Sequence, residues 1–243
     1  MNSSIENKSF RMGIRDGMPI CIGYLSVSFA FGIFATGLGL SVWEALLIST
    51  FNLTSAGQLA AVPIIAGMGS FIELAMTQLV INLRYSLMSV SLSQRMGESV
   101  RVRDRFLIAF ANTDEVFAVA SGKGTMLGRK YMFGLIIPPF FGWTLGTLLG
   151  AVCGNILPAL IISALGIAIY AMFVAIVVPV IKKDMKTALA VVCAVSLSCL
   201  FKYTPVLNKI PSGFVIIICA VAVSALFALA APIPEEEEAE KNE

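Results

Sequence analysis

Long, predominantly apolar runs alternate with short polar segments along most of this chain. Six runs are long enough to cross a hydrocarbon core about 30 Å thick, because a helix rises about 1.5 Å per residue. The six runs are residues 19–40, 72–92, 132–153, 159–181, 187–203 and 212–231. The first run exceeds the apolar core of a cleavable signal sequence, so we expect it to be retained as a helix. The pattern predicts an all-α, polytopic integral membrane protein.

Two further segments, residues 44–67 and 106–121, are apolar at their ends and polar at their midpoints. The polar positions are Asn52, Thr54, Ser55, Gly57 and Gln58 in the first segment and Asn112, Thr113, Asp114 and Glu115 in the second. Irregular polar backbone persists at membrane depth only where it is buried in protein or lines a cavity. We therefore expect both segments to be interrupted or re-entrant elements.

The basic residues distinguish full crossing from re-entry, because Lys and Arg concentrate in cytoplasmic loops. If both segments re-enter, thirteen basic residues near the spans lie on the side of the N-terminus and two, Lys202 and Lys209, lie on the other. If both segments cross fully, four arginines move to the wrong side: Arg95, Arg101, Arg103 and Arg105. We therefore expect six full spans, two re-entrant elements and both termini in the cytoplasm.

The same pattern divides the chain into three parts. Residues 1–18 are polar and are expected to form a cytoplasmic segment. Residues 19–231 form the transmembrane domain, embedded in the lipid bilayer of the cell membrane. Residues 232–243 contain two prolines and a run of glutamates, which is typical of a solvated, disordered tail.

The composition excludes several kinds of chemistry. Charged residues make up 13% of the chain, about half of the roughly 25% typical of soluble domains, and histidine is absent. A Ser-His-Asp relay and imidazole metal ligands are therefore excluded. The five cysteines lie in apolar stretches without a Cys-x-x-Cys pair, so we expect no metal or redox cofactor. Neither an enzyme nor a nucleic-acid-binding protein is indicated; a membrane hydrolase would need a Ser-Lys or aspartyl arrangement instead.

The run at 72–92 carries Asn82, Arg84 and Tyr85 within otherwise apolar sequence. An arginine in hydrocarbon costs at least about 2.5 kcal/mol on insertion scales, so it is expected to face a cavity or an acidic partner. Arg84 is therefore a candidate for substrate binding or coupling. The alternative is that its side chain extends along the helix to the membrane surface.

Asp114 and Glu115 are adjacent, so on a helix their side chains point about 100° apart. We expect one to face the transport pathway, where it exchanges a proton, and the other to face a cation or water. The alternative is that both lie in a hydrated cytoplasmic loop.

A helix broken at Asn52–Gln58 would present the backbone N–H groups of its second half to a carboxylate. The alternative for this cluster is ordinary hydrogen bonding between helices.

Two sequence regularities accompany these residues. Gly142, Gly146, Gly150 and Gly154 recur at every fourth position, which places them on one helix face and lets another helix approach closely. We expect this face to pack within the chain, with a seam to a partner subunit as the alternative. Phe51-Asn52-Leu53-Thr54 is weakly similar to Phe110-Ala111-Asn112-Thr113 and suggests an internal repeat, a feature common in transporters.

Several short motifs make the chain resemble the AzlC/YgaZ family up to the acidic tail. The motifs are Asp16-Gly17-Met18-Pro19, Phe29-Ala30-Phe31-Gly32, Ala56-Gly57-Gln58, Asn82-Leu83-Arg84-Tyr85 and Thr113-Asp114-Glu115-Val116-Phe117-Ala118. Their order and spacing carry the resemblance more than any one motif does. One position departs from the family, which often has histidine where this chain has Tyr85.

The resemblance implies the large subunit of a two-component exporter of branched-chain amino acids. It implies leucine, isoleucine and valine as substrates, with methionine as a further one, a small hydrophobic AzlD-type membrane subunit, and drive from the proton gradient. The residues themselves suit a zwitterion: Arg84 or the half-helix near Gly57 would hold the carboxylate, and Asp114 or Glu115 the ammonium. An amino acid uptake permease and a non-transporting membrane subunit are the alternatives.

Overall fold

The computed structural model describes residues 9–123, 126–154 and 184–230, with a few isolated positions between 158 and 182. Nearly all of these residues are helical, as expected for an all-α protein. The chain divides into two compact units. Unit 1 contains residues 1–68 and 81–171, and unit 2 contains residues 69–80 and 172–243.

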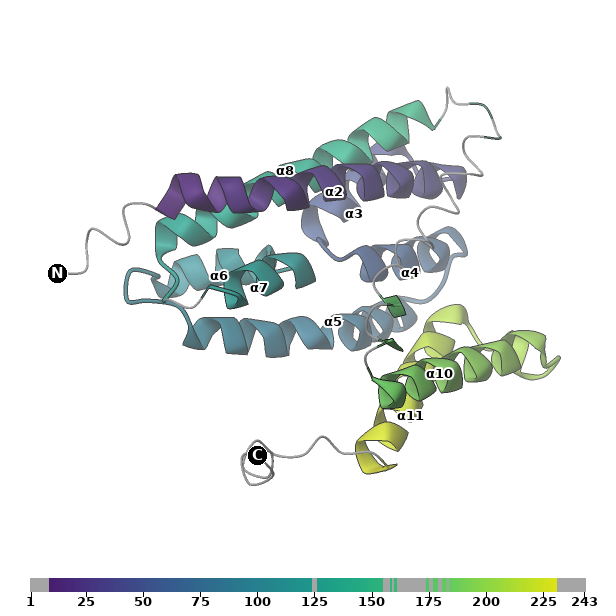
Figure 1. Ribbon diagram of the computed structural model, residues 1–243. Helices are drawn as coiled ribbons and strands as arrows, with labels where there is room; N and C mark the ends of the chain where they lie inside the picture. Colours follow the sequence, from purple (N-terminus) through teal and green to yellow (C-terminus); the bar gives the residue numbers. More distant parts are fainter. Residues whose placement is uncertain are drawn as a thin grey trace. The chain divides into compact units, whose positions relative to one another are not determined.

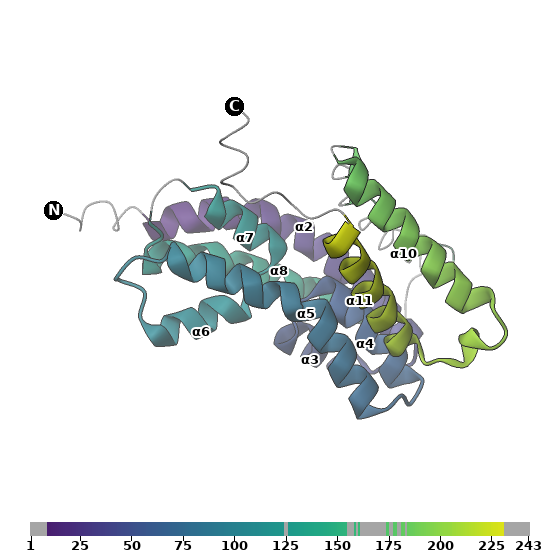
Figure 2. The same ribbon diagram turned by 90° about the horizontal axis from the view of Figure 1, so that it is seen from below.

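Two long helices, α2 (Ser9–Gly37) and α8 (Arg129–Cys153), lie side by side and form the frame of unit 1 (Figures 1 and 2). Phe10 contacts Gly134 near the starts of both helices, and Thr36 contacts Gly154 near their ends. The two helices therefore run in the same direction. The expected re-entrant geometry requires this, because the chain between them must then make one net return across the unit.

The glycine face of α8 is turned toward α2. A Cβ atom added at Gly142 would lie 2.5 Å from the carbonyl oxygen of Cys21, and one added at Gly150 would overlap the backbone of Phe29. Real Cβ atoms essentially never approach another group below 3.0 Å. The missing side chains therefore allow the backbones of α2 and α8 to touch, which is packing within this chain.

The first interrupted segment is a helical hairpin of α3 (Val42–Phe51) and α4 (Ser55–Ala66), hereafter the first hairpin. Ala45 near the start of α3 and Val62 in the second half of α4 belong to one buried cluster with Ala35 and Ala151, near the ends of α2 and α8. Both arms therefore open toward that end of unit 1. The break between them, at residues 52–54, lies deeper in the unit.

The second interrupted segment is a hairpin of α6 (Val102–Phe110) and α7 (Asp114–Ser121), hereafter the second hairpin. Asp104 in α6 pairs with Arg129 at the start of α8, 3.0 Å apart. At the other arm, Lys123 just after α7 pairs with Asp16 of α2, 2.7 Å apart. Both arms therefore open at the end where α2 and α8 begin, which we call the basic end because Arg95, Arg101, Arg103 and Arg129 lie there.

The two hairpins enter unit 1 from opposite ends, as Figure 1 shows for α3 and α4 on one side and α6 and α7 on the other. Each hairpin follows a long helix: α2 precedes the first, and α5 (Phe71–Gln94) precedes the second. Within unit 1, α5 runs toward the basic end, because Arg95 just after it donates to the Ser121 carbonyl at 2.7 Å. The order of elements thus occurs twice with opposite direction, the arrangement of an inverted repeat. The expectation of two interrupted segments is confirmed.

The largest difference between the helix limits and the expected spans is at the start of α2. Helix α2 begins at Ser9 instead of residue 19, because Asp16 bonds to Lys123 and to the Tyr131 hydroxyl (2.9 Å) and so holds the polar first turns within the helix. Among the described residues, four helices are long and apolar enough to span a membrane: α2, α8, α10 and α11. Helix α5 has 24 residues but is more polar. The expected span 159–181 and the tail 232–243 lie almost entirely outside the described residues.

Unit 2 contains α10 (Met185–Tyr203), the short 3-10 helix η1 (Leu207–Lys209), α11 (Ser212–Ala230) and the start of α5. Asp184 caps α10 by accepting from the backbone of Thr187 at 2.9 Å. Glu73 is only 4% exposed and accepts a hydrogen bond from the Gly213 amide, 2.9 Å away. A carboxylate at a helix N-terminus is stabilised by the exposed N–H groups there, which explains how α5 keeps a buried glutamate.

The opposed hairpins predict the accessibility of two loops. In a chain whose five native cysteines are replaced by alanine, Glu98→Cys at the basic end should resist a membrane-impermeant thiol reagent in intact cells. Leu38→Cys, which follows α2 at the opposite end, should react, and permeabilised cells should show both sites labelled. Labelling of both sites from outside would contradict the opposed hairpins. Labelling of Glu98→Cys alone would show that the protein has the opposite orientation in the membrane.

Candidate functional site: two broken helices meet

Two aromatic side chains occupy the centre of unit 1, where the hairpin breaks converge. Tyr24 projects from the middle of α2 and Trp143 from the middle of α8, with ring centroids 5.0 Å apart in an edge-to-face arrangement. The Tyr24 hydroxyl donates to the Glu115 carboxylate of the second hairpin. The Trp143 indole donates to the Gln58 side-chain oxygen of the first hairpin, 2.8 Å away. This aromatic pair therefore connects the two broken helices.

Gln58 is completely buried, and both ends of its amide are used inside the protein. Its oxygen accepts from Trp143, and its nitrogen donates to the Ser49 hydroxyl at 2.7 Å. Ser49 in turn lies 2.7 Å from the Thr147 hydroxyl of α8. Because its bonds are to neighbouring helices, Gln58 positions the first hairpin against α8.

The second arm of each hairpin begins at the break, so the N-termini of α4 and α7 both lie at the centre. Thr113 caps α7. The first turn of α7 carries Asp114 and Glu115, and the N–H groups at a helix N-terminus stabilise carboxylates there. Helix α4 has no acidic residue in its first turn, and Thr54 at its N-cap donates to Asn52 (3.2 Å) and does not cap the helix. Ser55 and Gly57 form the first turn of α4. The positive end of the α4 dipole therefore has no side-chain carboxylate in its own first turn.

Arg84 lies near the middle of α5 and pairs with Asp114 at the start of α7. Its guanidinium is 2.8 Å from the Asp114 carboxylate, and the side chains are 47% and 44% exposed. Arg84 also donates to the Tyr85 hydroxyl at 3.2 Å and lies over the Tyr85 ring, 4.9 Å from its centroid. The arginine is thus neutralised at the helix break, and does not need to reach the membrane surface.

The two asparagines on either side of this pair are at least partly buried. Asn112, in the break of the second hairpin, is 3% exposed and donates to the Ser89 hydroxyl of α5 at 3.3 Å. Asn82 lies on α5, two residues before Arg84. The site therefore combines one arginine, two carboxylates and several neutral polar groups within an otherwise apolar unit.

The family profile described as "AzlC protein" matches residues 19–157, more than half of the chain. This chain belongs to the AzlC family.

Two relatives show that the similarity extends across distant organisms. The chain is 34% identical over 173 residues to the inner membrane protein YgaZ of Escherichia coli strain K12, an alignment covering 68% of this chain and 70% of that protein. It is 31% identical over 184 residues to an uncharacterized membrane protein of Archaeoglobus fulgidus, covering 75% and 80% respectively. No solved structure matches with statistical significance. The protein is a membrane protein, and the AzlC match includes every side chain of the central site.

The central site contains five residues that the sequence pattern did not single out: Tyr24, Trp143, Ser49, Thr147 and Ser89. Ser49 lies in the first interrupted segment and the other four lie in apolar runs, where they look like ordinary span residues. The sequence offers only a weak signal for Tyr24 and Trp143. Buried tyrosine and tryptophan usually have a hydrogen-bond partner, so each of them implies a polar group nearby. Among the described residues, no three side chains of metal-binding type lie close enough together to hold a metal ion.

Proposed function

We propose that this protein is the large subunit of a two-component secondary transporter that exports branched-chain amino acids across the cell membrane. The substrates are leucine, isoleucine and valine, with methionine as a further one. The observation that carries the proposal is the Arg84–Asp114 ion pair at the start of α7, 2.8 Å long and partly accessible. Transporters commonly bind their substrates where helices are interrupted.

An ion pair of this kind suits a zwitterion. The substrate carboxylate replaces Asp114 as the partner of Arg84, and the planar guanidinium holds a carboxylate through two parallel hydrogen bonds. The substrate ammonium then pairs with the displaced Asp114. Because a zwitterion has no net charge, this exchange leaves no uncompensated charge within the membrane.

The adjacent carboxylate provides a means of proton coupling. The Glu115 carboxylate accepts a hydrogen bond from Tyr24; protonation adds an O–H donor and leaves the carbonyl oxygen as acceptor, which changes the bonding between the two side chains. Tyr24 contacts Trp143, which bonds to Gln58 of the first hairpin. A proton taken up on the second hairpin is thereby communicated to the first hairpin, which opens toward the opposite end of unit 1.

The preference for branched-chain substrates follows from the apolar surroundings. Each buried methylene contributes about 0.8 kcal/mol, so isoleucine is favoured over alanine. Apolar pockets separate substrates differing by one methylene by only about 1–3 kcal/mol, so discrimination among leucine, isoleucine, valine and methionine is loose. Charged side chains are rejected because the site offers them no partner beyond the groups already engaged.

We assign a small hydrophobic AzlD-type subunit as the partner, on the basis of family membership. Among the described residues, α10 buries only Phe201 and α11 only Gly213, which leaves apolar faces for lipid or for such a subunit. Amino acid uptake is the second candidate function, because alternating access to one central site serves either direction.

Intracellular isoleucine after a pulse of isoleucine-containing dipeptide tests this proposal. Cells that express the protein with its small subunit should lose the accumulated isoleucine faster than cells with an empty vector, and an uncoupler should abolish the difference. Expression of the large subunit alone should give little export. An unchanged pool under every condition would refute export, and faster uptake of external free isoleucine would establish the uptake alternative.

A further inference from the structure

A cavity of about 460 Å³ lies between α5 and α6 in unit 1, on the basic-end side of the ion pair. Its inner wall is apolar and includes the buried residues Leu92, Met96 and Ile108. The size falls within the range of about 300–1,000 Å³ typical of small-molecule sites. None of the described residues that line the cavity is acidic.

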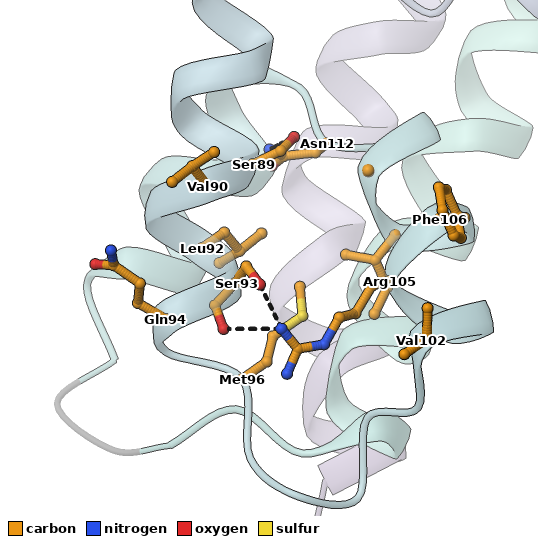
Figure 3. A pocket seen from close by; sticks show the side chains of 12 residues that line it. Ser89, Val90, Leu92, Ser93, Gln94, Met96, Val102, Arg105, Phe106 and Asn112 are labelled. Atoms are coloured by element: carbon orange, nitrogen blue, oxygen red, sulfur yellow. Dashed lines mark hydrogen bonds between the residues drawn. The ribbon is translucent and has the colours of Figure 1, made fainter.

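Two polar side chains in this lining have unused bonding capacity. Asn112 is 3% exposed, and its Oδ1 atom has no hydrogen-bond partner among the described residues. Arg105 donates to the Ser93 hydroxyl and to the Ser93 carbonyl oxygen (3.4 Å), as the dashed lines in Figure 3 show. Within the described part of the chain, no carboxylate lies within 4.0 Å of Arg105, so its charge is not neutralised.

The spacing of these groups follows from α5. Asn112 is bonded to Ser89 and Arg105 to Ser93, one turn further along, so the two anchor points are about 6 Å apart along the helix axis. Both side chains line the same cavity, so an ammonium and a carboxylate carried on one carbon atom can contact the two groups together. Asn112 supplies the acceptor, Arg105 the cationic donor, and the inner wall the apolar contact.

We propose that this cavity is a second amino acid site, a vestibule that receives a zwitterion with an aliphatic side chain from the basic end. The inference rests on the proposed transport function and deepens it. Asn112 lies two residues before Asp114, so a substrate held in the vestibule is next to the Arg84–Asp114 pair. In an exporter whose basic end faces the cytoplasm, the vestibule captures the substrate before the central pair opens.

A lipid acyl chain is the other occupant that the apolar wall suggests. The rim includes Val90, Val102 and Phe106, each at least 60% exposed. Hydrocarbon has no donor for Asn112 Oδ1 and no anion for Arg105, and leaving such groups unsatisfied at membrane depth is costly. A zwitterion satisfies both groups, and we therefore favour it.

Equilibrium binding of labelled isoleucine to the protein purified together with its small subunit, in nanodiscs, tests the vestibule. The unmodified protein should bind two isoleucines per chain. Ala109→Phe fills the cavity from α6, so only the central site should remain. Arg84→Gln should remove the central site and leave the vestibule, and the combined variant should bind no isoleucine. Leu107→Phe adds the same ring to α6 outside the cavity lining and should retain both sites. Monodisperse elution of each variant establishes that it is folded.

A second comparison identifies the group that Arg105 recognises. In the Arg84→Gln background, the remaining site should prefer isoleucine to isoleucinol, which lacks the carboxylate, by about tenfold or more. Arg105→Gln should remove this preference, and Arg105→Lys should restore part of it. A variant that merely disturbed the α5–α6 contact would weaken both ligands equally.

The outcomes separate the two proposals. One isoleucine per chain, lost in Arg84→Gln and retained in Ala109→Phe, would overturn the vestibule and leave the proposed function standing. Absence of isoleucine binding in the unmodified protein would overturn both. Tightly retained lipid that Ala109→Phe excludes, together with a single isoleucine site, would identify the cavity as a lipid site and overturn the inference.

Discussion

Removing the charge of Arg84 or Asp114 singly should lower the rate of isoleucine export at least tenfold, and removing both charges together should not restore it. Each single variant, Arg84→Gln or Asp114→Asn, leaves its partner charge uncompensated at the helix break. The double variant is neutral again, so its expression and stability should recover. Export should remain lost, because neither the carboxylate nor the ammonium of the substrate then has a charged partner. Initial export rates, normalised to the amount of folded protein, give the comparison.

Two further variants sharpen this test. Arg84→Lys keeps the charge but loses the planar fork, so it should also reduce export while leaving expression largely intact. Arg103→Gln removes a basic residue that is exposed at the basic end and should export normally. If the neutral double variant transports at the normal rate, the pair has only a structural role and the proposed binding mode is wrong.

Replacing Gly150 by leucine should destabilise the fold more than any other single change discussed above. The added side chain meets the backbone of Phe29, which no rotamer change moves aside, so α2 and α8 must separate. Overpacking of this kind costs about 1–3 kcal/mol where side chains can adjust and more where backbone must move. We expect little or no monodisperse protein after detergent extraction, measured by size-exclusion chromatography.

Gly23→Leu is the matched control for this prediction. Gly23 lies within α2, the helix that Gly150 of α8 contacts, but a Cβ atom at Gly23 has no neighbour within 4 Å. The variant should therefore be extracted as well as the unmodified protein. Equal recovery of Gly150→Leu and Gly23→Leu would show that the α2–α8 approach is looser than the structure indicates.

The sequence by itself determined the class of protein and the positions of its polar breaks. Runs of about twenty apolar residues must be helices, because a membrane interior has no partners for free backbone groups. The same constraint marks Asn52–Gln58 and Asn112–Glu115 as exceptions, and each contains part of a helix break, at residues 52–54 and 111–113. The positive-inside count further indicated re-entry, since only that arrangement brings the arginines of residues 95–105 to the side of Lys123 and Arg129.

Only the tertiary structure decided which side chains meet. Arg84 and Asp114 are thirty positions apart along the chain and Tyr24 and Glu115 are ninety-one apart, and no periodicity within one helix encodes such pairs. Ser89, Ser93 and Arg105 likewise became a cavity lining only when α6 folded back along α5. Hydrophobic patterning specifies which residues are buried in the membrane, but it carries no information on the rotation of one helix against another. That rotation depends on close contacts such as the glycine face of α8 against α2, and it places Trp143 beside Tyr24 between the two hairpins.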